Sequence, residues 1–424
     1  MANIQPRKNK DGKIISYCIR VHKGRDASGK QLKPYTKTFF FDEKWSEKKI
    51  QAELQKAATL FENECKNGIV ADNKQSFERY ANYVINLKER IGIKHRTIVR
   101  YKELLERINP AIGHYKLCDL KPQHLNAFYE QLSKDGMNKA TGGKLSNKTI
   151  LEHHRLIRTI LAQAEKELLV PYNAASKATH PKVEHKEANY IEIEDIERIL
   201  FYSLQEPLKK QVALNLLIFT GCRRGEIMGL KWSDIDFKNN MINIKRTLLY
   251  SKDRGIYEDT PKTEQSKRSI SVPAKVIEVL KSYKKEYNTK KLSLGTAWTD
   301  TGFIFVQENG KPMHPDTLTD YCSSFRTKYN NLITKENKKK SNKDKMPLLP
   351  HLNPHAFRHS QASMLILSGL DCATVSKRLG HAKISTTTDI YSHIMKKADE
   401  KASNTLENIL LNNSDDKIYS AKSS

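Results

Sequence analysis

The sequence predicts a multidomain protein with a small α+β domain, an all-α domain and a larger, mainly α domain of the α+β class. Three observations support this prediction. The chain has 424 residues, more than one domain usually holds. Its hydrophobic period changes from strand-like to helical near residue 44, and both periods occur after residue 190. Polar, glycine-containing or proline-containing segments without periodicity separate the three parts.

The charge of the chain narrows the class of partner. Lys and Arg number 74 against 48 Asp and Glu, which gives a formal net charge of +26. So large an excess concentrates polyanions at the protein surface, and nucleic acid is the first candidate. Hydrophobic residues make up 38% of the chain, which is enough to build proper cores, so bulk disorder is excluded.

Export, membrane insertion and metal binding have no support in the sequence. The longest apolar stretch, Val212–Phe219, is far too short to span a bilayer, and the N-terminus has no apolar signal core. The cysteines lie far apart without a C-x-x-C pair, which is typical of reduced thiols rather than of a disulfide framework or a zinc knuckle. We therefore expect a cytoplasmic protein without a metal site.

Residues 1–67 form the predicted α+β domain. Two β-rich runs, Lys13–His22 and Lys33–Phe41, and a first strand near Ile4–Lys8 predict a three-stranded antiparallel sheet. A helical pattern follows from Lys44 to about Cys65.

The exposed face of this small basic sheet could read DNA. Its candidate DNA-binding residues are Lys13, Arg20 and Lys37. The alternative is a structural cap whose lysines are merely solvated.

Residues 74–178 form the predicted all-α domain. Its expected helices are Phe77–Glu89, Thr97–Ile108, Lys121–Lys134 and Ser146–Glu167, with room for a fifth, and Pro110, Gly113 and Gly142-Gly143 separate them. Basic residues cluster near one helix start, where amides and cations together suit phosphate, and Lys94, Arg96 and Arg100 are the candidate DNA contacts. The polar stretch Pro171–His185 is interpreted as the interdomain linker.

Residues 186–412 form the third domain, and residues 413–424 form a polar tail. Expected helices are Glu194–Ser203, Pro207–Phe219, Ala274–Tyr287, Pro315–Tyr329 and His355–Leu367, and expected strands are Met241–Thr247, Ser269–Val272 and Phe303–Val306. The segment Tyr257–Arg268 resembles a hairpin tip, and the lysine-rich run Lys335–Lys345 is expected to be a mobile surface loop.

Two arginines are candidates for a phosphate clamp. Arg223 follows an apolar helix and a Thr-Gly turn, and Glu226 lies three residues on, where it could hold the guanidinium. An arginine fork donates two parallel hydrogen bonds to a phosphoryl group and never loses its charge. The alternative is a structural Arg–Glu pair.

Arg358 and His355 lie three residues apart at a helix start, where they would bind a phosphate beside an imidazole. The alternative is that this spacing occurs by chance.

The remaining candidates lie in two segments. His381 follows a predicted glycine C-cap at Gly380, and Tyr391 lies in a polar turn shortly after it. A tyrosine beside two arginines would have its phenolate favoured, which lowers its pKa. Lys262 is one of several lysines in the segment before the second predicted strand, and by itself it could be ordinary.

Together these residues resemble the tyrosine recombinases, also called the phage integrase family, over residues 1–412. The markers stand in the family order: T-G-C-R at Thr220–Arg223 with Glu226, then Lys262, H-A-F-R-H at His355–His359, L-G-H at Leu379–His381, and Tyr391. The resemblance implies an arm-type DNA-binding domain at 1–67, a helical, SAM-like core-binding domain at 74–178 and a tyrosine-recombinase catalytic domain at 186–412.

The resemblance also implies the chemistry. Tyr391 would attack a DNA phosphodiester and form a 3′-phosphotyrosyl link, while Arg223 and Arg358 would clamp the phosphate with help from His381. Lys262 would protonate the leaving 5′-oxygen and His355 would accept the tyrosine proton. Glu226 would orient the site. No ATP, metal or other cofactor would be needed.

The implied partners are double-stranded DNA with core-type and arm-type attachment sites, and further copies of the chain in a homotetramer. An excisionase and a host DNA-bending protein are candidate accessory factors, all in the cytoplasm of a bacterial host. The amphipathic segment Ile394–Leu411 would pack on a neighbouring protomer or on its own domain. Two other functions stay open, a type IB topoisomerase and a non-catalytic DNA-binding regulator.

Overall fold

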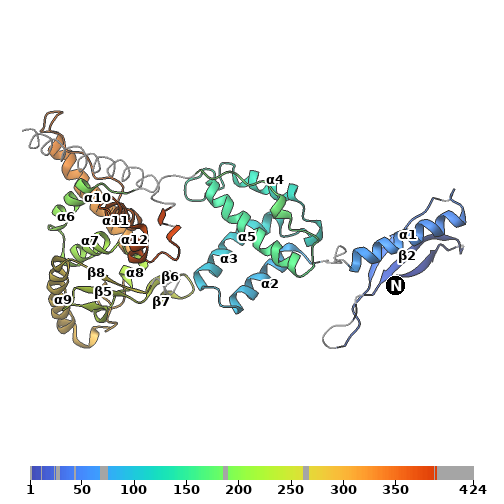
Figure 1. The fold of residues 1–424 in the computed structure, drawn as a ribbon, viewed down its shortest axis with the longest axis horizontal. Helices are drawn as coiled ribbons and strands as arrows, with labels where there is room; N and C mark the ends of the chain where they lie inside the picture. Colours follow the sequence, from blue (N-terminus) through green and yellow to red (C-terminus); the bar gives the residue numbers. More distant parts are fainter. Residues whose placement is uncertain are drawn as a thin grey trace, which may run out of the picture. The chain divides into compact units, whose positions relative to one another are not determined.

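The computed structural model describes residues 2–10, 12–22, 24, 29–42, 44–66, 75–184, 190–260, 267–385 and 387–388 (Figure 1). The chain divides into two compact units, Met1–His185 and Lys186–Ser424. The first unit contains the predicted sheet and the helical region, and the second contains most of the predicted site residues.

The N-terminal sheet has the predicted three antiparallel strands in the order β1 (Asn3–Lys8), β2 (Ile14–Val21) and β3 (Tyr35–Phe39). Helix α1 (Glu47–Lys66) covers one face (Figure 1). The strand and helix side chains that meet there are apolar and buried: Ile19, Val21, Leu54, Ala58 and Phe61. Because β2 is the central strand, its side chains alternate between this face and the opposite face, on which Ser16 and Cys18 are also buried.

The helical region is built from α2 (Phe77–Arg90), α3 (His95–Ile112), α4 (Pro122–Leu132) and α5 (Asn147–Lys166). Ser76 and Ser146 cap α2 and α5, since each side chain accepts a hydrogen bond from a backbone N–H of the first turn. The prediction that Pro110 ends a helix was wrong, because α3 continues to Ile112. Proline lies in the last turn, and the helix closes with a 2.8 Å bond from the Gly113 amide to the Asn109 carbonyl.

The segment interpreted as a linker is largely part of the helical region. Residues Ala174–Lys177 form a short 3₁₀ turn, η2, whose Ala174 and Ala175 are buried in the same core as the helices. Asn173 donates to the Arg158 carbonyl at 2.9 Å, and Asn147 donates to the Lys182 carbonyl at 2.9 Å. The prediction failed because small residues and side-chain amide bonds, rather than an apolar period, hold this segment.

In its described residues, the second unit is mainly helical with two small sheets. Its elements are α6 (Ile193–Ser203), α7 (Leu208–Thr220), α8 (Arg224–Met228), β4 (Ile235–Asp236), β5 (Met241–Ile244), β6 (Thr247–Ser251), β7 (Gly255–Asp259), β8 (Arg268–Ser271), α9 (Ala274–Leu294), α10 (Thr317–Asn337), α11 (Pro354–Leu367) and α12 (Cys372–Leu379). Helix α7 is buried along nearly its whole length and packs against α6, α9 and α11 (Figure 1). It is the central helix of the unit, so its C-terminus lies inside the fold.

The strands of this unit differ from the prediction in three places. The run Met241–Thr247 divides between β5 and β6, which belong to different sheets, and Arg246 at the break forms an ion pair with buried Asp234. Residues Phe303–Val306 are buried but make only isolated bridges in the described part of the chain, so they form no ladder. The predicted hairpin tip instead joins two sheets, because β7 pairs with β6 and β8 pairs with β5.

The lysine-rich run begins inside a helix. Helix α10 extends to Asn337, so only the later part of Lys335–Lys345 is loop. Asn337 closes the base of this loop: its side chain donates to the Met346 carbonyl at 2.7 Å and accepts from the Met346 amide at 2.9 Å.

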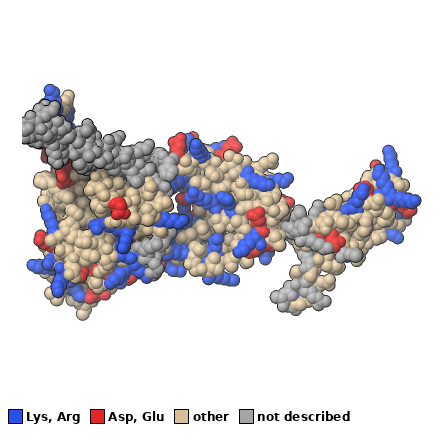
Figure 2. Space-filling view, in the orientation of Figure 1, with Lys and Arg blue, Asp and Glu red and all other residues tan. Residues whose placement is uncertain are grey.

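Basic side chains are common on the visible surface of both units (Figure 2). Of the helices in the described residues, none has the length and apolarity needed to cross a bilayer.

Candidate active site

Two helices of the second unit, α7 and α12, end in the same kind of turn. Helix α7 ends at Gly221 with φ 56°, and α12 ends at Gly380 with φ 69°, both in the left-handed region that glycine adopts without strain. The last carbonyls of a helix lack intrahelical donors and carry the negative end of its dipole. The two ends therefore present a group of carbonyl oxygens that attracts cations.

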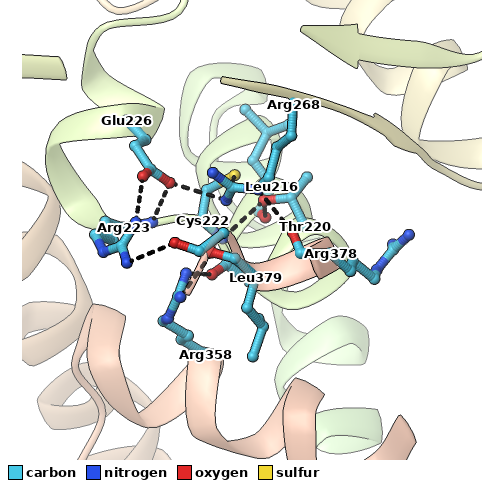
Figure 3. Close-up of polar contacts among 11 residues, drawn as sticks. Leu216, Thr220, Cys222, Arg223, Glu226, Arg268, Arg358, Arg378 and Leu379 are labelled. Atoms are coloured by element: carbon cyan, nitrogen blue, oxygen red, sulfur yellow. Dashed lines mark hydrogen bonds and ion pairs between the residues drawn. The ribbon is translucent and has the colours of Figure 1, made fainter. Parts of the chain in front are cut away.

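Arg358 on α11 bridges these two ends. Its guanidinium donates from Nη1 to the Gly221 carbonyl at 2.8 Å and from Nη2 to the Leu379 carbonyl at 2.7 Å (Figure 3). The residue is 4% exposed. Burial, and next the Arg223 charge, lower the pKa of Arg358 to about 10, so it stays protonated at neutral pH.

Arg223 precedes α8, and its side chain contacts the turn that ends α12. Its Nη2 donates to the Gly380 carbonyl at 3.1 Å, and its Nη1 donates to Glu226 Oε1 at 2.7 Å (Figure 3). Its backbone N–H donates to Glu226 Oε2 at 3.0 Å, which closes a capping arrangement at the start of α8. The side chain is 37% exposed, so it is accessible from the surface.

Glu226 is a buried carboxylate shared by two arginines. Arg268 Nη2 donates to its Oε2 at 3.0 Å, while Arg223 holds Oε1. Burial raises the pKa of Glu226, but Arg268 first and Arg223 second outweigh it, so the net pKa is lowered. The carboxylate is ionised at neutral pH.

Arg268 and Arg378 belong to this cluster and were missed by the sequence reasoning. Arg268 Nε donates to the Arg378 carbonyl at 2.7 Å, and Arg378 Nη2 donates to the Phe219 carbonyl at 2.9 Å and the Ser271 carbonyl at 3.2 Å. A signal existed for Arg268, because it stands in phase with Ile270 and Val272 in a strand and so faces the core.

Three histidines lie near these cations. Burial, then Arg358, Arg223 and Arg224, lower the pKa of His355 below its ordinary value. Burial, then Arg358 and Arg223, lower the pKa of His381 to about 4. His381 Nδ1 lies 2.8 Å from Thr387 Oγ1. Burial lowers the pKa of His359 to about 4 as well, so all three imidazoles are neutral at neutral pH.

The fold thus brings together Arg223, Glu226, His355, Arg358 and His381 from three separate stretches of sequence. Four guanidiniums and one carboxylate leave a net positive charge, held mostly by carbonyls, which suits a phosphate group. The other two predicted site residues, Lys262 and Tyr391, lie outside the described residues.

Arg224 and the candidate DNA contacts take varied places. Arg224 pairs with Asp316 and donates to Thr319 at the start of α10. Lys94 precedes α3, whereas Arg100 is paired with Glu152 at 2.6 Å and Glu103 at 3.1 Å. Arg96 lies 4.0 Å from Glu103.

The three candidates in the N-terminal region also differ in position. Lys13 is exposed beside β2, and Arg20 is half-buried on the face of the sheet opposite to α1. Lys37 pairs in register with Ile19, so it lies on the face that α1 covers, and its ammonium sits 5.4 Å from the Phe61 ring centroid.

Known proteins match both units. Residues 189–398 match the phage integrase family, and residues 77–133 match the phage integrase N-terminal SAM-like domain. A "Tyrosine recombinase XerC-like" protein of Caldanaerobacter subterraneus is 28% identical in an alignment covering 95% of this chain and 98% of that protein. The integrase of Staphylococcus phage L54a is 30% identical over 54% of this chain and 62% of that protein.

A solved structure shows the same fold. The Tn1549 transposon integrase in complex with circular-intermediate DNA superposes with a TM-score of 0.61 at 21% identity, covering 78% of this chain and 100% of that chain.

Proposed function

The chain belongs to the phage integrase family and is a tyrosine recombinase, an enzyme of DNA strand transfer, and we propose that it is a site-specific integrase with Tyr391 as its nucleophile. The observation that carries the proposal is the Arg223–Arg358 pair, whose two forks are oriented by the ends of α7 and α12. Two oriented cations can bind the non-bridging oxygens of a phosphodiester and stabilise the charge that develops during attack.

The proposed attack exchanges one phosphoester bond for another and moves two protons. Tyr391 Oη forms a bond to phosphorus, and the bond from phosphorus to the 5′-oxygen breaks. His355 accepts the phenolic proton, which its lowered pKa permits because the ring is neutral, and Lys262 gives a proton to the 5′-oxygen. The product is a 3′-phosphotyrosyl link and a free 5′-hydroxyl, and the reverse steps rejoin strands.

His381 supports the phosphate as a neutral donor. When the Thr387 hydroxyl donates to Nδ1, the ring carries its proton on Nε2, which then donates to a phosphate oxygen. Glu226 orients Arg223. Since one phosphoester is exchanged for another, the step needs no ATP, and arginines supply the positive charge that a metal would otherwise supply.

Each of three regions of the chain is proposed to have its own role on DNA. We assign residues 1–67 to arm-type sites, residues 74–178 to core-type sites and residues 186–412 to catalysis. In the first of these, Arg20 and Lys37 lie on opposite faces of the sheet. Exchange of two duplexes requires four strand cuts, and one tyrosine per chain then requires a homotetramer.

The proposed setting is the cytoplasm of a bacterial host, where the enzyme integrates and excises a mobile element. An excisionase and a DNA-bending protein remain candidates for choosing the direction of the reaction. A type IB topoisomerase shares the chemistry, but it has no use for separate arm-binding and core-binding regions.

The test uses the full-length protein and a nicked attachment-site substrate that traps the covalent intermediate. Wild type should give a DNA adduct on a denaturing gel, and Tyr391→Phe should give none. Tyr250→Phe, at a 42% exposed tyrosine of β6, is the matched control and should trap DNA normally. An adduct with Tyr391→Phe would move the nucleophile elsewhere, and no adduct with wild type would favour the non-catalytic regulator.

A further inference from the structure

Arg268 is a cation inside the fold that the proposed chemistry does not use. It opens β8, and its side chain is 6% exposed, so it has little access to a bound duplex. A buried guanidinium is costly unless its donors are satisfied. The contacts of Arg268 therefore indicate its role.

The first contact concerns charge. Arg268 Nη2 lies 3.0 Å from Glu226 Oε2, and Arg223 Nη1 lies 2.7 Å from Glu226 Oε1 (Figure 3). One carboxylate is thus shared by two guanidiniums. Without Arg268, Glu226 would form a neutral pair with Arg223 alone, and its carboxylate would compete with a phosphate for that arginine.

The second contact concerns position. Arg268 Nε donates to the Arg378 carbonyl at 2.7 Å, just before the Leu379–Gly380–His381 turn. The carbonyls of Leu379 and Gly380 are the acceptors that hold Arg358 and Arg223.

The guanidinium also packs tightly against this turn. A Cβ at Gly380 would lie 2.8 Å from Arg268 Nη1, so the glycine permits the close approach. Arg268 Nη2 also lies 3.3 Å from the Sγ of Cys222, the residue that directly precedes Arg223.

We propose that Arg268 is a positioning residue of the recombination site: it shares the charge of Glu226 so that Arg223 stays available to the phosphate, and it fixes the Leu379–His381 turn. The inference rests on the proposed function. Arg268 does not touch the DNA. It acts through Arg223, and through the two carbonyls that orient both clamp arginines.

The first experiment compares Arg268→Gln and Arg268→Lys with wild type, measuring DNA affinity, thermal unfolding and the rate of covalent adduct formation. Arg268→Gln should lower the rate about 10- to 100-fold, the range expected for losing a charged hydrogen bond, with DNA affinity nearly unchanged. Arg268→Lys keeps the charge but lacks the fork, so it should recover part of the rate.

Two further readouts separate positioning from mere support of the fold. On a substrate with a neutral methylphosphonate at the cleaved position, the Arg268→Gln defect should shrink, because the arginine charge then has less to stabilise. Glu226→Gln added to Arg268→Gln should raise cleavage above the single variant, since it removes the unbalanced carboxylate.

The matched control is Arg246→Gln. Arg246 is also a largely buried arginine of this unit, paired with buried Asp234 and with the Gly229 carbonyl. This variant should lower the unfolding temperature but retain cleavage at temperatures where it is folded.

The inference is overturned if Arg268→Gln cleaves like wild type, or if its defect is equal on the charged and neutral substrates. It is also overturned if the double variant is slower than the single one. Each of these results would leave the proposed function intact, because wild type would still trap DNA. Only a wild-type enzyme that forms no adduct would remove both proposals.

Discussion

Arginines in two regions of this protein are held by different sets of acceptors. In the second unit, Arg358 donates to the carbonyls of Gly221 and Leu379. Arg223 donates to the Gly380 carbonyl and to Glu226, a carboxylate that it shares with Arg268. In the helical region, Arg100 donates to two carboxylates, Glu103 and Glu152. The sequence proposed both groups as contacts for phosphate, Arg223 and Arg358 from their motifs and Arg100 from a basic cluster near a helix start.

The difference lies in how much charge each arrangement leaves. A carbonyl is a dipole, so it orients a guanidinium without cancelling its charge. A carboxylate orients the guanidinium and also neutralises it. Arg358 is therefore fixed and still cationic, and Arg223 shares its carboxylate with Arg268, whereas Arg100 is fixed and compensated. Burial adds to the contrast, because Arg358 is 4% exposed and the Arg100 side chain is 44% exposed, where water screens its interactions.

The largest expected effect is at Arg358. Arg358→Lys keeps a positive charge but cannot donate to Gly221 and Leu379 in parallel, so the phosphate loses an oriented donor. We expect cleavage to fall about 100- to 1000-fold, as when one oxyanion donor is removed elsewhere. Adduct formation on the nicked substrate measures it.

Arg100→Gln is the control from the other region, and its cleavage rate should stay within about twofold of wild type, because an exposed ion pair contributes little. Equal losses of cleavage rate in Arg358→Lys and Arg100→Gln would contradict the proposed difference between the two groups of arginines.

An intermediate effect is expected from pH. The pKa of His355 is lowered by burial and then by Arg358, Arg223 and Arg224, so the ring is neutral above that lowered value and can accept a proton. Cleavage should hold as pH falls to about 6.5, the ordinary histidine value, and decline only below it.

Arg224→Gln sharpens this test. Removing a nearby positive charge raises the pKa of His355, so the acid limb of the cleavage profile should move to higher pH. An acid limb that does not move, or that moves to lower pH, would contradict His355 as the proton acceptor.

The smallest effect is expected in the helical region. Glu103→Gln with Glu152→Gln releases Arg100 from both carboxylates and leaves its charge uncompensated. If this surface meets DNA, affinity should rise about two- to fivefold at low salt, the value of one or two exposed charge interactions. Binding titrations at two salt concentrations measure it, and unchanged affinity at low salt would remove Arg100 from the DNA contacts.

The elements of the fold were largely predictable where a period was long. Helices α2, α5, α7 and α11 lie within a few residues of their expected bounds, because each has an extended apolar stripe or a capping residue. Short elements were not predictable in this way. The turn η2 and the buried segment Phe303–Val306 have too few residues for a period, and side-chain amides or isolated bridges hold them.

The site divides along the same line. The sequence by itself determined the types of residue at Arg223, Glu226, His355, Arg358 and His381, and the glycines that end the two helices, because local motifs encode them. The tertiary structure decided which groups hold those arginines: the carbonyls at the ends of α7 and α12, and Arg268 across Glu226. A backbone carbonyl is the same in every residue, so no sequence pattern marks the few that the fold turns toward a cation.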